Sequence, residues 1–129
     1  MKKTFLALLM TALIASVVPG AETHAKVPLA PSNDSHVSGF VEITQLPQGG
    51  SDVSVVVTKG LTPGQVYASF YYESSDCTEP ADLLGTFVGR PSRGGQIQGK
   101  IDDDLDEVGS VSVRIGPGYG TLLGCATVH

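Results

Sequence analysis

The sequence predicts an all-β domain, an antiparallel sandwich or flattened barrel of about seven or eight strands. Apolar and polar residues alternate along several segments, and a period of two is typical of half-buried strands. Turn-forming Gly and Pro clusters separate these segments, which are rich in β-branched residues. The 129 residues suit a single domain.

The N-terminus carries the pattern of a secretion signal, which we predict for residues 1–25. Lys2 and Lys3 precede an apolar run at 4–18, and Pro19 ends it. A run of this length is short for a bilayer-spanning helix and typical of a cleaved signal peptide. We therefore expect a secreted or extracytoplasmic protein with no membrane span after the signal is removed.

Two small-residue cleavage sites compete, one after Ala21 and one after Ala25. The sequence favours the second, because Pro19 lies three positions before the first cut. The next segment, 26–35, contains two prolines and no apolar periodicity, so we expect a flexible leader. The folded domain is then expected over 36–129.

Charge and cysteine content exclude several classes of protein. Eight Lys and Arg stand against 13 Asp and Glu, and the net charge of −5 becomes −6 once the signal segment is removed. This balance argues against nucleic acid as a partner, because phosphate binding requires a basic surface. Cys77 and Cys125 are too few for a thiolate zinc site and lack CxxC spacing, so in an exported protein we expect one disulfide.

The expected strands follow one another along the mature chain. They are predicted at 37–43, 53–58, 66–73, 83–88, 96–101, 111–115 and 122–128. In the strand at 66–73 one face carries Val66, Ala68, Phe70 and Tyr72, and we expect this face to be interior. The tyrosines at 67 and 71 would then point outward.

Four short motifs occur in an order shared with a known family. Val37-Ser38-Gly39 opens the domain, and Gly60-Leu61-Thr62-Pro63-Gly64 precedes the strand at 66–73. An acidic residue and Cys77 follow, and Leu123-Gly124-Cys125-Ala126 lies near the C-terminus. This order resembles that of the copper/zinc superoxide dismutase-like family. The resemblance implies a Greek-key β-sandwich in which the two cysteines pair.

The positions that bind metal in that family carry other residues here. Its histidine pair falls on Phe70 and Tyr72, and its active-site arginine falls on Leu122. The mature chain has only His36 and His129, whereas a copper/zinc pair needs several converging imidazoles. The resemblance therefore implies the fold without a catalytic metal, a cofactor or catalytic residues; a divergent copper/zinc metalloprotein is the alternative.

An acidic run, Ile101–Glu107, is the most conspicuous polar segment. Asp102, Asp104 and Asp106 occupy spacings 1, 3 and 5 of a calcium loop, so these three are a weak calcium-site candidate. However, Glu107 stands where such a loop needs glycine, and Val113 stands at its last ligand position. We expect a solvated acidic turn, with calcium or a basic partner as alternatives.

Five further side chains are candidates for binding. Tyr67 and Tyr71 are expected on the outer face of their strand, and Tyr119 lies in a Gly- and Pro-rich loop. Arg90 and Arg93 flank a proline in another loop and could form an anion clamp. For each of them, cross-strand pairing or a plain turn is the structural alternative.

These observations together favour an exported, non-enzymatic binding module, such as an inhibitor or a surface-binding protein. The chain has no G-x-S-x-G motif and no phosphate-binding glycine loop. We expect an extracytoplasmic protein or glycan as partner, and a basic partner would complement the acidic surface.

Overall fold

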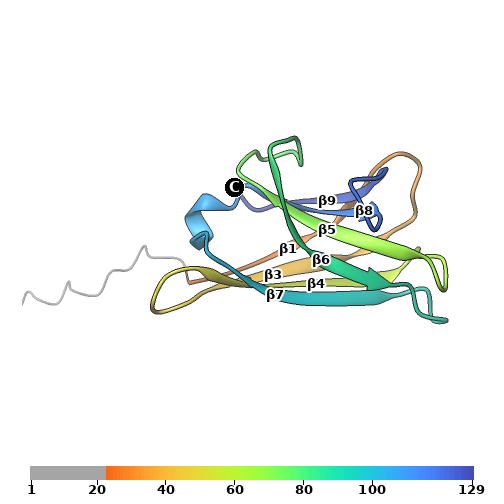
Figure 1. Ribbon diagram of the computed structural model, residues 1–129, viewed down its shortest axis with the longest axis horizontal. Coiled ribbons are helices and arrows are strands. Elements are labelled where there is room, and N and C mark those ends of the chain that lie inside the picture. The colour runs from red at the N-terminus through yellow and green to blue at the C-terminus, as the bar shows by residue number, and fades with distance from the viewer. Residues whose placement is uncertain (1–22) are drawn as a thin grey trace, which may run out of the picture.

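A computed structural model describes residues 23–129, so the predicted signal segment lies almost entirely outside the described residues. The described chain forms a sandwich of two antiparallel sheets (Figure 1). The four-stranded sheet has the order β1 (His24–Pro28), β3 (Ser38–Gln45), β4 (Ser51–Lys59) and β7 (Gly95–Ile101). The five-stranded sheet has the order β2 (Ala30–Pro31), β9 (Leu122–Thr127), β8 (Ser110–Ile115), β5 (Val66–Tyr72) and β6 (Ala81–Val88).

The predicted all-β sandwich with one disulfide is confirmed. The two sheets do not close into a barrel, and a single 3-10 turn, η2 (Leu105–Glu107), lies between β7 and β8. Within residues 23–129, no helix is long and apolar enough to cross a membrane.

Alternation along β3 and β4 builds the core between the sheets. Val53, Val55 and Val57 of β4 are buried, as are Val41 and Ile43 of β3. The intervening residues of β4 are only half-buried, as the period of two requires. Each of these apolar side chains stabilises the fold by about 1.5 to 3 kcal/mol when it is fully buried.

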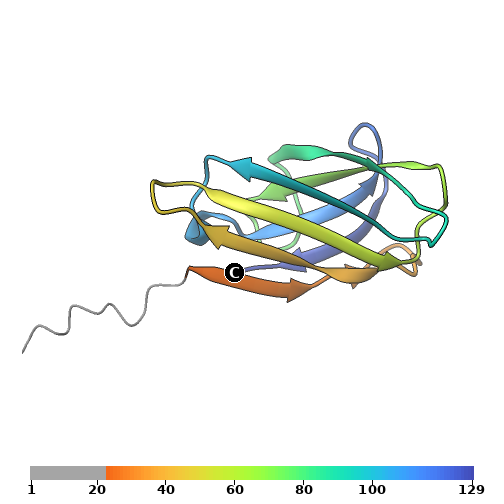
Figure 2. The same ribbon diagram turned by 90° about the horizontal axis from the view of Figure 1, so that it is seen from below.

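The expected flexible leader at 26–35 is wrong, because much of it forms two edge strands. β1 pairs with β3 from His24–Thr44 to Pro28–Phe40, and β2 pairs with β9. The chain passes between the two sheets at Leu29, whose side chain is buried. Proline is tolerated on edge strands, so the prolines that suggested a leader do not prevent pairing. Figure 2 shows β1 at one edge of the four-stranded sheet.

The faces predicted for β5 are also reversed. Tyr67 is only 3% exposed inside the main core, and its hydroxyl accepts a hydrogen bond from the backbone N–H of Thr62 at 2.7 Å. Tyr71 packs partly buried against the same core. Phe70 and Tyr72 are buried too, but in a second cluster that includes Cys77. Both faces of β5 are covered, so alternation alone does not identify the inner one.

The disulfide between Cys77 and Cys125 joins the loop after β5 to β9. The two cysteines are 48 residues apart. A loop of that length corresponds to a stabilisation of about 4 kcal/mol in the chain-entropy description. A disulfide in a small domain is consistent with an extracytoplasmic location.

Candidate functional site

At one end of the sandwich, the loop after β7 is hydrogen-bonded to the β3–β4 turn through Asp104 and Gly50, and to the end of β5 through Gly109 and Tyr72. Figure 1 shows η2 of this loop near the β3–β4 hairpin. Two further hydrogen bonds hold these loops to the strands: the hydroxyl of Ser110 in β8 donates to the carbonyl of Ser74 at 2.7 Å, and that of Ser51 in β4 donates to the carbonyl of Asp103 at 2.8 Å. Carboxylates gather here from three parts of the chain. We call this group the acidic end: Glu73, Asp82, Asp102, Asp103 and Glu107.

The acidic end concentrates negative charge that forms no ion pair with a cation of residues 23–129. Burial raises the pKa of Asp103, and the nearby carboxylates of Glu107, Asp82, Glu73 and Asp102 raise it further. Among residues 23–129 the one ion pair is between His24 and Glu42. The acidic end is therefore a surface where negative charges repel one another without a counterion from the described chain.

Tyr71 lies beside the acidic end. Burial raises the pKa of its hydroxyl, and the carboxylates of Asp82, Asp103 and Asp102 raise it further. An aromatic ring bordered by carboxylates has the chemistry that attracts ammonium and guanidinium groups. Of the predicted binding residues, Tyr71 is the one that the fold brings to the acidic end.

Asp104 differs from its neighbour Asp103 because hydrogen bonds stabilise its charge. Its Oδ1 accepts from Nε2 of Gln45 at 2.9 Å and from the backbone N–H of Gly50 at 2.8 Å, which lowers its pKa. Oε1 of Gln45 in turn accepts from the backbone N–H of Leu105 at 2.7 Å. Asp104 therefore attaches the loop after β7 to the β3–β4 turn.

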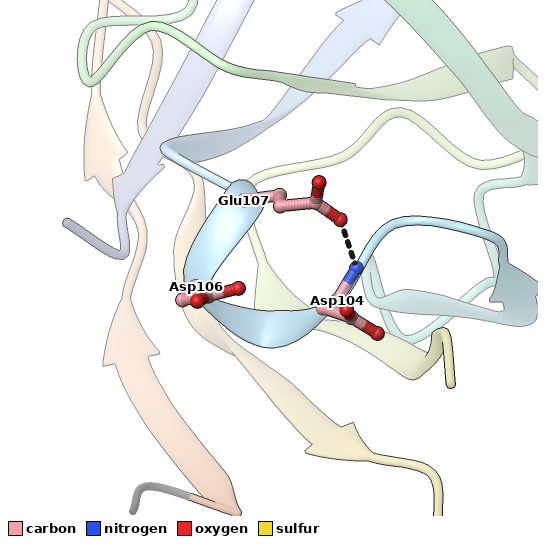
Figure 3. Close-up of side chains that lie close together, drawn as sticks. All are labelled: Asp104, Asp106 and Glu107. Atoms are coloured by element: carbon pink, nitrogen blue, oxygen red, sulfur yellow. Dashed lines mark hydrogen bonds between the residues drawn. The ribbon is translucent and has the colours of Figure 1, made fainter. Parts of the chain in front are cut away.

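The predicted calcium set does not form as a group. One oxygen from each of Asp104, Asp106 and Glu107 lies within 4.8 Å of the others, whereas Asp102 is not part of this set (Figure 3). Oε1 of Glu107 accepts from the backbone N–H of Asp104 at 2.7 Å. Two of the three carboxylates thus already hold the turn through hydrogen bonds, which explains their position without a metal.

A second polar group, the outer-face cluster, covers the outside of the five-stranded sheet: Phe70, Tyr72, Arg114, Tyr119 and the Cys77–Cys125 disulfide. Nε of Arg114 donates to the hydroxyl of Tyr72 at 3.1 Å, and Nη1 donates to the carbonyl of Gly120 at 2.9 Å. Nη2 donates to the hydroxyl of Tyr119 at 2.9 Å and to the carbonyl of Cys77 at 3.3 Å. The guanidinium therefore connects β5, β8 and two loops.

The aromatic rings of the outer-face cluster pack closely around this guanidinium. Its carbon lies 3.7 Å from the ring centre of Tyr119, and that ring meets Phe70 edge to face at 4.9 Å. The hydroxyl of Tyr72 also hydrogen-bonds the hydroxyl of Ser112 at 2.7 Å. Burial and hydrogen bonding with Tyr72 raise the pKa of Tyr119 to about 12, although Arg114 acts in the opposite direction.

The five predicted binding residues do not converge on one site. Tyr67 is in the core, Tyr71 borders the acidic end and Tyr119 belongs to the outer-face cluster. Arg90 and Arg93 lie at the other end of the sandwich, in the β6–β7 hairpin (Figure 1). Their guanidinium groups are exposed and form no hydrogen bond or ion pair with the described part of the chain.

Sequence reasoning missed Arg114 and the role of Gln45. A single charged residue inside the strand at 111–115 was a signal for the first, because a charge on a buried strand needs partners. Gln45 had no such signal, since the hydrogen bonds by which it attaches the loop after β7 are with Asp104 and Leu105, about 60 positions away.

No protein-family model matches the sequence, and no curated protein matches it significantly.

Proposed function

We propose that this chain is an exported, non-catalytic binding module that holds a basic protein at its acidic end. The observation that supports this proposal is the group of five carboxylates at the acidic end, four of which raise the pKa of the fifth, Asp103, and which have no counterion from residues 23–129. A basic partner would relieve this repulsion and would be attracted over a distance of several ångströms in physiological salt.

Tyr71 would supply the apolar part of the contact. A lysine or arginine of the partner would lie against its ring while the carboxylates around it bind the charge. An extracytoplasmic protein that presents a basic loop, such as a secreted hydrolase, fits this chemistry, and the module would then act as an inhibitor or a surface-binding protein.

Export is part of this proposal. Cleavage after Ala25 would remove His24, which pairs with Thr44, and also Thr23, whose carbonyl accepts from the backbone N–H of Gln45 at 2.8 Å. Cleavage after Ala21 would leave β1 complete. We therefore expect the intact mass of the exported protein to correspond to an N-terminus at Glu22; a mass that starts at Lys26 would contradict this.

The alternative function is that of a divergent copper/zinc metalloprotein, related to the superoxide dismutase-like family in fold. The positions that hold histidine ligands in that family carry Phe70 and Tyr72; the hydroxyl of Tyr72 accepts from the Arg114 guanidinium, and Phe70 packs against the ring of Tyr119 that lies over it. A fixed cation with aromatic neighbours opposes a second cation, so this donor set does not fit copper or zinc. Stoichiometric copper or zinc in the purified protein, together with superoxide-dependent activity, would overturn our proposal.

A capture experiment with matched baits tests the basic partner. Immobilised wild type, the double variant Glu73→Gln/Asp102→Asn and the control Asp34→Asn/Glu42→Gln are each exposed to the extracellular fraction. Both double variants lose two negative charges, but only the first loses them at the acidic end. We expect basic proteins retained by wild type and by the control to be lost from the first variant. Equal retention by all three baits would reject the acidic end as the binding site.

A further inference from the structure

The Cys77–Cys125 disulfide lies outside the core between the sheets. Cys77 belongs to the second cluster of buried residues, and Cys125 packs partly buried against that cluster. Cys125 is in β9, which is held in place by its pairing with β8 and with β2. The segment whose position depends on the bridge is therefore the connection of residues 73–80 between β5 and β6, which we call the Cys77 loop.

Side chains of β8 and β9 also attach the Cys77 loop. The hydroxyl of Ser110 accepts from the backbone N–H of Cys77 at 2.9 Å, and that of Thr127 donates to the carbonyl of Ser75 at 2.8 Å. The carbonyl of Cys77 accepts the longest hydrogen bond of Arg114, at 3.3 Å. Water can replace each of these partners when the loop moves, so a single hydrogen bond holds the loop less strongly than the covalent bridge does.

The backbone of Cys77 has a left-handed conformation, with a φ of 58°. Residues other than glycine, asparagine and aspartate rarely adopt it, because their Cβ atom comes too close to the following carbonyl oxygen. Such a conformation persists where the surrounding structure imposes it. Here the disulfide and the bonds to Ser110 and Arg114 impose it, so breaking the bridge frees a residue that favours another conformation.

The two cysteines differ in their access to solvent. Cys77 is 2% exposed, whereas Cys125 is half-buried. Thiol–disulfide exchange begins with the attack of an external thiolate on one sulfur, and its rate depends on access to that sulfur. An external thiolate therefore reaches the sulfur of Cys125 first.

We propose that this disulfide is a redox-sensitive latch, a bridge whose reduction by a dithiol releases the Cys77 loop. A thiolate of the dithiol attacks Sγ of Cys125 and forms a mixed disulfide, while the bond to Sγ of Cys77 breaks and that sulfur leaves as a thiolate. The second thiol of the reductant then displaces Cys125. The protein gains two electrons and two protons, and the dithiol becomes a cyclic disulfide.

The two sheets keep their strands when the latch opens. The pairing of Tyr72 with Ala81 holds both ends of the Cys77 loop, and the main core contains neither cysteine. The loop begins at Glu73, so its release also displaces one carboxylate of the acidic end. This last consequence rests on the proposed function, whereas the latch itself does not.

Hydrogen exchange followed by mass spectrometry tests the latch in the mature full-length chain. Oxidised wild type is compared with wild type reduced by dithiothreitol and with the variant Cys77→Ser/Cys125→Ser without reductant. We expect exchange in the Cys77 loop to be at least about tenfold faster in the second and third samples, because local opening exposes its amides. Exchange in β4 and in the β6–β7 hairpin should change little, and reoxidation of the wild type should restore the original rates.

Three outcomes would overturn the proposal. Dithiothreitol leaves the disulfide intact in the folded protein, or the loop exchanges at its original rate although thiol titration finds two free thiols, or β4 is exposed together with the loop. The wild-type samples need no substitution and decide the question if the double variant does not fold. Capture of a basic protein is measured separately, so failure of the latch and failure of the proposed function are distinguishable.

Discussion

The outer-face cluster and the acidic end lie outside the core between the sheets, and they differ in whether their charged groups have partners within the fold. In the outer-face cluster, Arg114 donates four hydrogen bonds and stacks on Tyr119. At the acidic end, Asp103 faces four other carboxylates and no cation pairs with them within residues 23–129. The charge of Arg114 has partners within the fold, whereas the carboxylates of the acidic end have no counterion from residues 23–129.

This difference separates a stabilising group from a candidate binding surface. A charged group with a complete set of partners gains little from a ligand, because a ligand would have to replace hydrogen bonds that already exist. Uncompensated like charges lower the stability of the free protein, and this cost is recovered on binding an opposite charge. Substitutions in the two groups should therefore change stability in different directions.

The largest change in the free energy of unfolding is expected for a substitution in the outer-face cluster. Arg114→Ala should lower the free energy of unfolding by roughly 2 to 4 kcal/mol, because it leaves the hydroxyls of Tyr72 and Tyr119 and two carbonyls without their donor. Arg93→Ala, which removes an exposed guanidinium without bonded partners, should change it by less than about 0.5 kcal/mol. Chemical denaturation measures both. Similar values for the two variants would show that the cluster does not stabilise the fold.

An intermediate effect is expected for Tyr119 in alkaline solution. Tyr119→Phe should lower the free energy of unfolding by about 1 kcal/mol near pH 8, because the hydrogen bond from Arg114 is lost. The pKa of Tyr119 is raised from 10.0 to about 12 on folding, so wild type loses the associated stability as the pH rises from 10 to 12. Tyr119→Phe has no hydroxyl to ionise and does not lose this stability. The difference in free energy of unfolding between wild type and the variant should therefore narrow between pH 8 and pH 11. A constant gap would contradict the raised pKa.

The smallest changes in stability are expected for two adjacent carboxyls at the turn after β7. Folding raises the pKa of Asp103, so the stability that its carboxyl contributes is present below pH 3.8 and is lost as the pH rises through the folded pKa. Asp103→Asn should therefore stabilise the protein at pH 7. Folding lowers the pKa of Asp104, so the stability that its carboxylate contributes is present above pH 3.8 and is lost in acid. Asp104→Ala should therefore destabilise the protein at pH 7. Thermal melts at pH 7 and pH 3 measure both, and shifts of the same sign at pH 7 would reject the distinction.

Much of the fold was predictable from short-range patterns, whereas the sites were not. Val53, Val55 and Val57 recur at every second position, and that spacing of β-branched residues indicates a half-buried strand. Tyr67 was misplaced because β5 is covered on both faces, which removes the contrast that alternation depends on. The edge strand β1 was missed because its stability comes from pairing with β3, not from its own residues.

By itself the sequence determined the all-β class and the acidic character of the chain, because the period of two and the charge balance are read directly from the residues. It also determined the pairing of the cysteines, because the chain has only two. Only the tertiary structure decided which carboxylates are neighbours and which arginine finds partners. Asp82 and Asp103 are 21 positions apart in sequence, and their interaction exists only because two strands of different sheets bring them to the same end. Electrostatic and hydrogen-bonding energies depend on distances in space, which no local pattern of residues specifies.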